Sequence, residues 1–327
     1  MDRRRRTYLQ LSLVVLLWSG AFVGIKVLLE HASIWTIAFL RFALTTIGLT
    51  LAMAVLRPRT HRVERAHVPW FLVLGLTGVS VYHLSLNFGE RYISANVAAL
   101  IVASMPVMTA ILAMVFLGED VSATRWAGIA LAVAGVAVLV VWGTPDADLT
   151  VRDAAGAAVT ALAPLAWSVY TIVSKRLVGT YGALPLATYA LGIGTLMLAP
   201  FAIGPTIRDL SDLTLTDWGW IAFLGLGCSA LAYVLWFDAL DVLDASSVAA
   251  WVYLVPLLGQ VWAAVVLDEA VTVFLVIGGA MVLAGVVVIE RVASKTVAPT
   301  PPIPAELPVP QKRNIGLPST CRILGRY

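Results

Sequence analysis

An apolar stretch interrupted by proline occurs twice in this chain and limits the available folds more than any other feature. The first copy covers 95–119 and reads ANVAALIVASMPVMTAILAMVFLGE; the second covers 245–269 and reads ASSVAAWVYLVPLLGQVWAAVVLDE. Pro106 and Pro256 are 150 positions apart (256 − 106), as are the glutamates near the ends of the copies. Each stretch is long enough to cross a bilayer. Two copies of one broken membrane helix indicate a duplicated membrane protein.

Composition supports a membrane protein. The 327 residues are 60% hydrophobic and 13% charged, with mean hydropathy +0.90, against about 45–50% apolar and roughly 25% charged in soluble domains. We expect helices, because these runs are too long and too uniformly apolar for barrel strands. The ten predicted spans lie near 8–29, 34–56, 69–88, 95–117, 124–142, 154–173, 184–203, 218–237, 245–267 and 272–289.

The two halves of the chain align without a gap. Residues 70–140 and 220–290 share 19 identities in 71 positions. Because each half holds five spans, an odd number, the second half must cross the membrane in the opposite sense. The sequence therefore predicts an all-α membrane protein of ten transmembrane helices in two inverted five-helix repeats. Its predicted parts are repeat one (1–142), an external linker (143–153), repeat two (154–291) and a proline-rich disordered tail (292–327).

The distribution of basic residues predicts the orientation. With the N-terminus inside, 17 of the 22 Lys and Arg fall in cytoplasmic segments, as the positive-inside rule requires. We therefore expect a multi-pass protein of the bacterial inner membrane with both termini in the cytoplasm. The N-terminal arginines, 3–6, also resemble a twin-arginine export signal. However, no cleavage site follows and nine more spans do, which favours a retained first helix. The two cysteines, Cys228 and Cys321, imply no disulfide framework.

Several short motifs recur in order over both halves. The first half carries Trp18-Ser19, Arg41-Phe42, Pro106, Leu117-Gly118-Glu119, Gly128 and Gly135; the second carries Trp167-Ser168, Trp236, Ala239-Leu240, Ala245-Ser246, Pro256, Glu269, Gly278 and Gly285. In this pattern the chain resembles the drug/metabolite transporter superfamily, as a ten-helix transporter with EamA-type repeats. The resemblance covers about 11–290. It departs from the family at Asp268, where the first repeat has glycine, and at Gly89-Glu90.

The resemblance implies a secondary transporter that works by alternating access, and an exporter of amino acids or related small metabolites. Its expected partners are a small-molecule substrate, the lipid bilayer and a proton or counter-substrate for coupling, with no nucleic acid and no cofactor. We expect no enzyme activity, because an intramembrane protease needs a nucleophile and a base in mid-span, and only His83 could be the base. The alternative is a non-transporting scaffold or lipid-handling protein.

Ionisable and aromatic residues within spans are the candidates for substrate binding. His83 and Asn87 share a helical face and either line a cavity or bond neighbouring helices. Trp18 and Trp167 occupy equivalent positions in the first span of each half, and the resemblance places those helices around a central cavity; the alternative is an interfacial belt. The remaining substrate candidates are Tyr82, Tyr170, Tyr233, Trp251 and Tyr253.

Prolines and end charges are the candidate hinges and gates. Pro106 and Pro256 free a carbonyl in mid-membrane and act either as hinges or as static kinks. Glu119 and Glu269 are either gate residues or boundary charges before the next helix. Arg41 lies deeper within a span, where it pairs with a carboxylate or binds an anionic substrate group. No acid lies at the middle of a span, so any proton coupling would fall to His83 or to an end carboxylate.

Overall fold

The computed structural model describes residues 3–58, 63–89, 92, 101–142, 154–266 and 272–293. All secondary structure in these ranges is helical, with no strand, which confirms the predicted fold class. Within the described ranges, seven helices are long and apolar enough to cross a membrane, and two shorter apolar helices and α1 complete the series of ten. The predicted linker 143–153, and the predicted tail from 294 onward, lie outside the described residues.

The first half of the chain supplies five spans. Their elements are α1 (Arg3–Leu28), α2 (Ile34–Leu56), η1 (Arg65–His67), α3 (Val68–Gly75), η2 (Leu76–Val81), α4 (Tyr82–Gly89), α6 (Met105–Leu117) and α7 (Ala123–Trp142). Elements η1 to α4 form one span, and α6 is the described main part of the proline-broken fourth span.

The second half supplies the other five. Their elements are α8 (Ala154–Thr160), α9 (Leu162–Tyr181), α10 (Ala183–Asp209), α11 (Leu215–Ala222), η3 (Phe223–Leu231), α12 (Ala232–Val242), α13 (Ala245–Ala250), η4 (Trp251–Tyr253), α14 (Leu254–Val266) and α15 (Val273–Ala293). Elements α8–α9, α11–η3–α12 and α13–η4–α14 each form one span.

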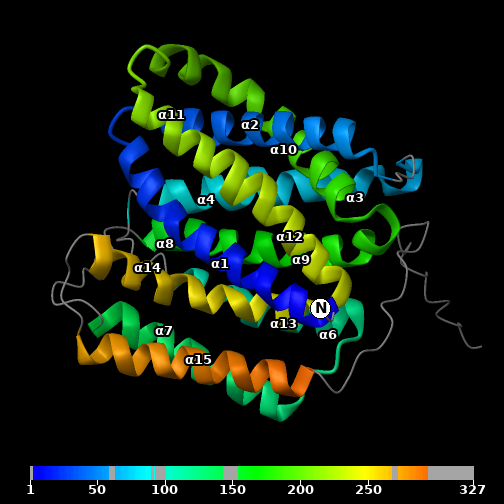
Figure 1. Cartoon of the computed structure of the whole chain (residues 1–327), viewed down its shortest axis with the longest axis vertical. Helices are drawn as coiled ribbons and strands as arrows, with labels where there is room; N and C mark the ends of the chain where they lie inside the picture. The colour runs from blue at the N-terminus through cyan, green and yellow to red at the C-terminus, as the bar shows by residue number, and fades with distance from the viewer. Residues whose placement is uncertain are drawn as a thin grey trace, which may run out of the picture.

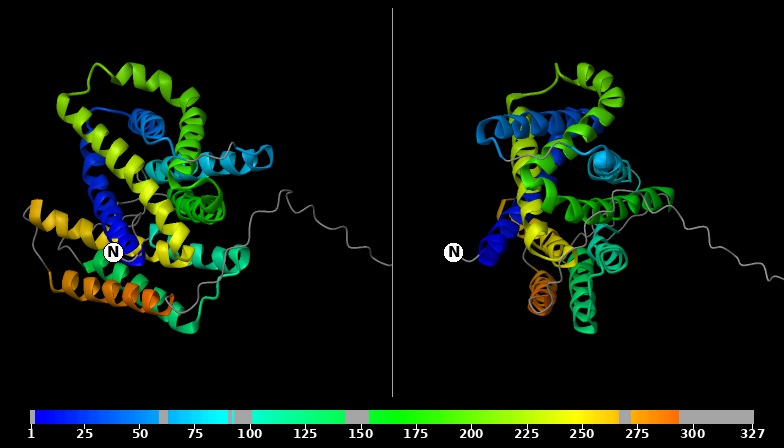
Figure 2. Two further views of the ribbon diagram at one scale, coloured as in Figure 1. Left: turned by 45° about the vertical axis from the view of Figure 1, so that its right-hand side comes forward. Right: turned by 90° about the vertical axis from the view of Figure 1, so that its right-hand side faces the viewer.

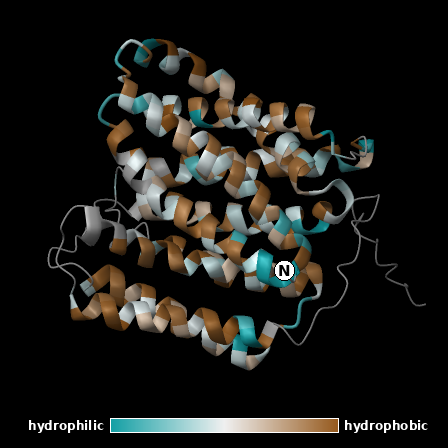
Figure 3. Cartoon of the chain, in the orientation of Figure 1, coloured by the Kyte–Doolittle hydropathy of each residue, from teal (hydrophilic) through white to brown (hydrophobic). Residues whose placement is uncertain are grey.

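The spans run side by side and share two ends (Figure 1). One of these, which we call the N-terminal end, holds the start of α1, the end of α6 and the start of α13. Contacts between the ends of different spans lie there, such as the ion pair of Arg3 in α1 with Asp241 in α12. Hydrophobic residues cover most of the helix surfaces, while hydrophilic residues gather near the helix ends and in the loops (Figure 3).

The same irregularities occur at equivalent places in both halves. The third span widens into π-helical turns at η2, and its counterpart does so at η3, which includes the residues 150 positions later. The fourth span is interrupted by a turn before Met105, and its counterpart by the 3-10 turn η4 before Leu254. Such local departures from α-helical bonding frequently occur at functional sites. The cavity described below is lined by residues that closely follow the π-helical turns (Tyr82, His83 and Tyr233) and by residues at the second pair of breaks.

Helices α7 and α15 pack closely through glycines, side by side at the bottom of Figure 1. Gly128 faces Gly285, and Gly135 faces Gly278. Gly128 and Gly278 are equivalent in the repeat, as are Gly135 and Gly285. Each helix therefore presents the same two positions to the other in antiparallel order, which is the contact that a local two-fold axis produces. This is the inverted relation that the odd span number predicts.

The remaining spans build the core between this pair and α10, which lies with α2 at the opposite edge (Figure 2). The largest buried cluster joins α1, α3, α6, α9, α10, α12 and α13, and includes Phe71, Tyr170, Trp236 and Phe237. Because these helices come from both halves, neither half encloses this core alone. The cavity lies within this central group.

We expect Gly135→Ala to destabilise the protein. A Cβ at this position would lie 2.8 Å from the Gly278 carbonyl oxygen and 2.8 Å from the Val282 nitrogen, and overpacking of this kind costs about 1–3 kcal/mol. The unfolding temperature in detergent measures it. Gly204→Ala is the matched control, since a Cβ there meets nothing within 4 Å. Equal unfolding temperatures for the two variants would contradict the close packing of α7 and α15.

Candidate functional site

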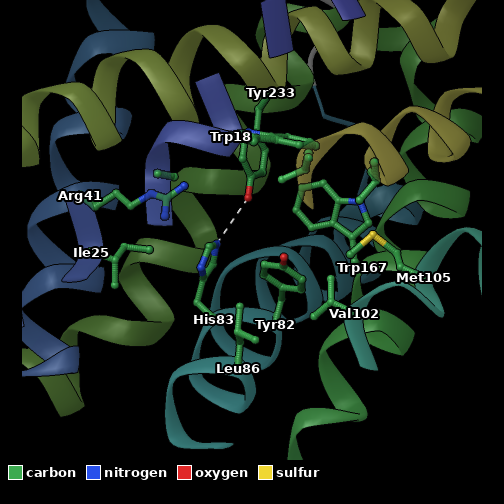
Figure 4. A pocket seen from close by; sticks show the side chains of 13 residues that line it. Trp18, Ile25, Arg41, Tyr82, His83, Leu86, Val102, Met105, Trp167 and Tyr233 are labelled. Atoms are coloured by element: carbon green, nitrogen blue, oxygen red, sulfur yellow. Dashed lines mark hydrogen bonds between the residues drawn. The ribbon is translucent and has the colours of Figure 1, made fainter. Parts of the chain in front are cut away.

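A cavity of about 90 Å³ lies between the two halves (Figure 4). A cavity needs roughly 10–15 Å³ to hold one water molecule. This cavity can therefore hold several waters or one solute of the size of a small amino acid. Its walls carry side chains from both repeats, and these are Trp18, Ala21, Ile25, Arg41, Tyr82, His83, Leu86, Val102, Met105, Trp167, Tyr233, Val252 and Val255.

Most of the wall is built from repeat-related pairs. Trp18 and Trp167 form one pair, at the shift of 149 that aligns the first helices. Three further pairs are related by a shift of 150: His83 with Tyr233, Val102 with Val252, and Met105 with Val255. Duplication thus places equivalent residues opposite each other around one space. This arrangement suits a site that must serve two related conformations.

Aromatic rings form the floor of the cavity. Trp18 stands edge-on to Trp167 with centroids 5.3 Å apart, and it contacts Trp236 at 5.1 Å. Its indole N–H donates to the carbonyl of Cys228, 2.9 Å away, within the π-helical segment η3. Trp167 also contacts Tyr82 at 5.0 Å. These contacts fix the rings, so the floor is a preformed aromatic surface rather than a flexible one.

His83 and Tyr233 face each other across the space. The His83 Nε2 and the Tyr233 hydroxyl are 3.5 Å apart, at the long limit of a hydrogen bond (Figure 4). The imidazole also packs against Phe42, with centroids 4.9 Å apart. The histidine is 8% exposed. A weak hydrogen bond between polar groups at a cavity can be exchanged for one to a bound solute at little cost.

Arg41 is the only charged side chain among the described residues that line the cavity. Its Nε donates to the Ser229 hydroxyl at 2.7 Å, and its guanidinium points into the space (Figure 4). Close packing holds the backbone here: a Cβ on Gly225 would lie 2.9 Å from the Arg41 carbonyl oxygen. Thr45 accordingly reaches both this carbonyl and that of Gly225, at 2.8 Å each. Helix η3 thus sets the position of the arginine on α2.

The N-terminal end of the bundle is closed by polar contacts to the segment that joins α12 and α13. The Glu119 carboxylate accepts hydrogen bonds from the Ala245 N–H at 2.6 Å, and from the Ser246 N–H and hydroxyl at 3.2 and 2.5 Å. It thereby caps α13, where the helix dipole favours a negative charge. Lys175 donates to the carbonyls of Leu240 and Leu243, at 2.5 and 2.9 Å.

Arg125 secures the same connection between α12 and α13. Its guanidinium donates to the Ser247 hydroxyl at 2.6 Å and lies 3.5 Å from the Asp244 carboxylate. Burial and the nearby charge of Glu119 raise the pKa of Asp244, against the lowering effect of Arg125 and Lys175. A carboxyl that ionises less readily here than in water is held more stably in its protonated form. The contribution of Asp244 to folding stability is therefore present at low pH and is lost as pH rises through this raised pKa.

Next to the cavity, α9 carries a row of buried polar groups that make no hydrogen bond within the described part of the chain. Trp167, Tyr170, Thr171 and Ser174 are spaced as i, i+3, i+4 and i+7, which places them on one helix face. All four are at most 3% exposed, and each has a side-chain N or O atom without a partner among the described residues. Ser168, by contrast, bonds the carbonyl four residues back at 2.7 Å. The row runs from the cavity floor toward Lys175.

A family model described as the EamA-like transporter family matches residues 5–141 and 154–291. The chain belongs to the EamA-like transporter family. The two matched segments correspond to the two halves around the cavity.

Individual proteins are also similar to this chain over most of their length. An "Uncharacterized transporter" of Archaeoglobus fulgidus is 32% identical over 88% of this chain and 99% of its own. A "Probable terminal-alkyne amino-acid exporter" of Streptantibioticus cattleyicolor is 33% identical over 86% of this chain and 92% of its own. A solved crystal structure superposes with a TM-score of 0.73 at 20% identity, covering 89% of this chain and 98% of that one. The structural likeness shows a shared fold.

The structure places five of the substrate candidates of this EamA-like transporter around the cavity. These are Trp18, Tyr82, His83, Trp167 and Tyr233. The other described candidates lie outside its walls. Tyr170 is in the row below, Trp251 donates to Glu290 at 3.1 Å, and Tyr253 belongs to the cluster around α7 and α15. The Asn87 side chain and Glu269 lie outside the described residues.

The hinge and gate candidates adjoin the helix breaks and the closed end. Pro106 and Pro256 each directly follow a wall residue, Met105 and Val255. Glu119 caps a helix of the other repeat rather than the helix that follows it. The sequence reasoning did not single out Met105, Val255 or their neighbours on the wall. The signal was available, because they are equivalent residues at the same distance from each proline.

We expect Glu119→Ala to destabilise the closed N-terminal end. It would leave two backbone N–H groups and one hydroxyl without their acceptor, at a cost of about 1–3 kcal/mol. Glu119→Gln keeps one acceptor oxygen, so its unfolding temperature should lie between those of Glu119→Ala and the wild type. Asp120→Ala is the control, because Asp120 is exposed. Unfolding temperatures for Glu119→Ala and Asp120→Ala that both match the wild type would refute the capping role.

Proposed function

We propose that this protein exports amino acids or closely related small metabolites by alternating access between its two repeats. Family membership supports transport, and the name of the Streptantibioticus relative supports an amino-acid substrate. The cavity has the size and mixed aromatic and polar character of a small-metabolite site. We place the protein in the bacterial inner membrane with the N-terminal end in the cytoplasm, because 17 of 22 basic residues fall on that side.

The observation that carries the mechanism is the row of unpartnered polar groups on α9. A buried polar atom without a hydrogen bond costs about 1–3 kcal/mol. In a membrane helix, serine and threonine ordinarily relieve this by bonding a carbonyl one turn back, yet Thr171 and Ser174 do not. Their groups would be satisfied if water or substrate entered between α9 and α12. We propose that the second conformation opens this path from the cavity floor to the cytoplasm.

Opening this path requires the contacts of the N-terminal end to break. Those contacts join Glu119 and Arg125 of the first repeat, and Lys175 of the second, to the segment between α12 and α13. Pro106 and Pro256 are the proposed hinges, since each lies at a helix break beside the cavity wall. For proton coupling, the groups we propose are His83 on the wall and Asp244 at the closed end.

Flux measurements test the function. Purified protein in proteoliposomes should exchange isotopically labelled leucine faster than empty vesicles do, because the cavity holds a small amino acid. His83→Ala should reduce this flux at least about tenfold, because it removes a polar group that contacts the substrate in the cavity. The unfolding temperature of the variant should stay near that of the wild type. Flux equal to empty vesicles for every amino acid and small metabolite tried would refute the proposal.

Thiol labelling tests the path along α9. In a variant without native cysteines, Ser174→Cys should react with a small hydrophilic thiol reagent applied from the cytoplasmic side, because water reaches this position when the path opens. Ala187→Cys is the control, as it is equally buried in the apolar core of α10. Equally slow labelling of both positions would place Ser174 in a permanently packed core.

A further inference from the structure

We infer that Arg41 binds the carboxylate of the transported substrate and thereby restricts the site to compact monocarboxylates, amino acids among them. This inference rests on the proposed transport function and specifies its substrate class. It starts from a charge that the described part of the protein does not neutralise.

Arg41 carries a permanent positive charge inside a membrane span. A guanidinium does not lose its proton in proteins. The residue lies seven positions into α2, roughly 10 Å along the helix at 1.5 Å per residue, and it is 6% exposed. No carboxylate among the described residues lies within ion-pair distance of it, whereas Arg3 and Arg125 each have one. A buried charge of this kind normally has a partner.

The geometry leaves the binding face of the guanidinium available. Its Nε is committed to Ser229, whose hydroxyl accepts at 2.7 Å. The two terminal nitrogens make no hydrogen bond to a described residue, and the side chain lines the cavity. Two parallel N–H groups at the end of a guanidinium match the two oxygens of a carboxylate. Ser229 thus orients the guanidinium group and leaves its two terminal nitrogens available for a ligand.

The opposite side of the cavity suits the rest of such a molecule. Figure 4 shows Arg41 entering from one side, with Trp167 and Met105 on the other. The apolar wall accepts an aliphatic body. In an α-amino acid the ammonium lies on the carbon next to the carboxylate, so the apolar side chain is the part that reaches this opposite wall.

The charge also breaks the symmetry of the wall. Residues 149 and 150 positions after Arg41 are Ala190 and Leu191, both fully buried and apolar. The first repeat therefore has a cation where the second has none. A substrate held by its carboxylate consequently keeps its charged end on α2 and meets the second repeat with its apolar part.

Binding of four matched compounds tests the inference. Leucine, leucinamide, 3-methylbutylamine and 4-methylpentanoate share one apolar body and differ only in the carboxylate and the amine. Each is tested for stabilisation of the detergent-solubilised full-length protein against heat, and for competition with labelled leucine in proteoliposomes. We expect leucine and 4-methylpentanoate to bind, and leucinamide and the amine to bind roughly 10- to 100-fold more weakly.

Variants then assign this preference to Arg41. Arg41→Gln should remove the preference for leucine over leucinamide, and Arg41→Lys should restore it only in part, because an ammonium cannot make the paired contact. Arg125→Gln is the matched control. It removes another buried arginine, away from the cavity, so the ratio of the two affinities should stay at its wild-type value whatever happens to the flux.

The outcomes separate the inference from the proposed function. Leucine transport with equal affinity for leucine and leucinamide would overturn the role of Arg41 and leave transport intact. The same holds if Arg41→Gln retains the wild-type preference. If Arg41→Gln does not fold, the wild-type series decides, since weak binding of 4-methylpentanoate relative to the amine would overturn the inference. Failure of all four compounds to bind or compete would overturn both the substrate class and the inference.

Discussion

Every polar group within a bilayer must find its partner inside the protein, because lipid offers none. Most of the described polar side chains of this transporter obey that constraint locally, as when Thr45 and Ser168 bond carbonyls of their own helices. Two adjoining places depart from it: four of the ten described side chains with a buried, unpartnered polar atom share one face of α9, and Arg41 on the cavity wall has no carboxylate among the described residues within ion-pair distance. Those places gain partners only when something enters, and this is the physical reason for regarding them as a route.

The duplicated fold explains how one short sequence pattern can build both sides of such a route. Two similar halves packed head to foot bring equivalent residues to opposite walls of one cavity, so a single helix break with its flanking side chains serves twice. The antiparallel glycine contacts of α7 and α15 hold the halves together away from the cavity. At the N-terminal end the halves are joined by hydrogen bonds and charges instead. Polar contacts of this kind can be exchanged for water, whereas close glycine packing cannot.

Much of this arrangement could be predicted from the sequence. Span length and an odd helix count predict the number and inversion of the repeats. Five of the candidate residues, chosen because they are polar or aromatic within apolar runs, line the cavity. Contacts between distant segments could not be predicted. Nothing in the sequence near Glu119 shows that its carboxylate caps α13, and no local pattern separates Tyr233, on the wall, from Tyr253, in another cluster. Those outcomes depend on which helix faces which neighbour, and the apolar residues Met105 and Val255 give no chemical signal of their own.

The central claim is that the N-terminal end opens and closes around the path beneath the cavity. The distance between spin labels on Asp120, in the first repeat, and Thr180, at the end of α9, measures this directly, since both positions are exposed at that end. In lipid nanodiscs we predict two distance populations, a shorter one for the closed end seen here and a longer one for the open end, with a ratio that substrate changes. A single distance that substrate leaves unchanged would contradict alternating access in this protein.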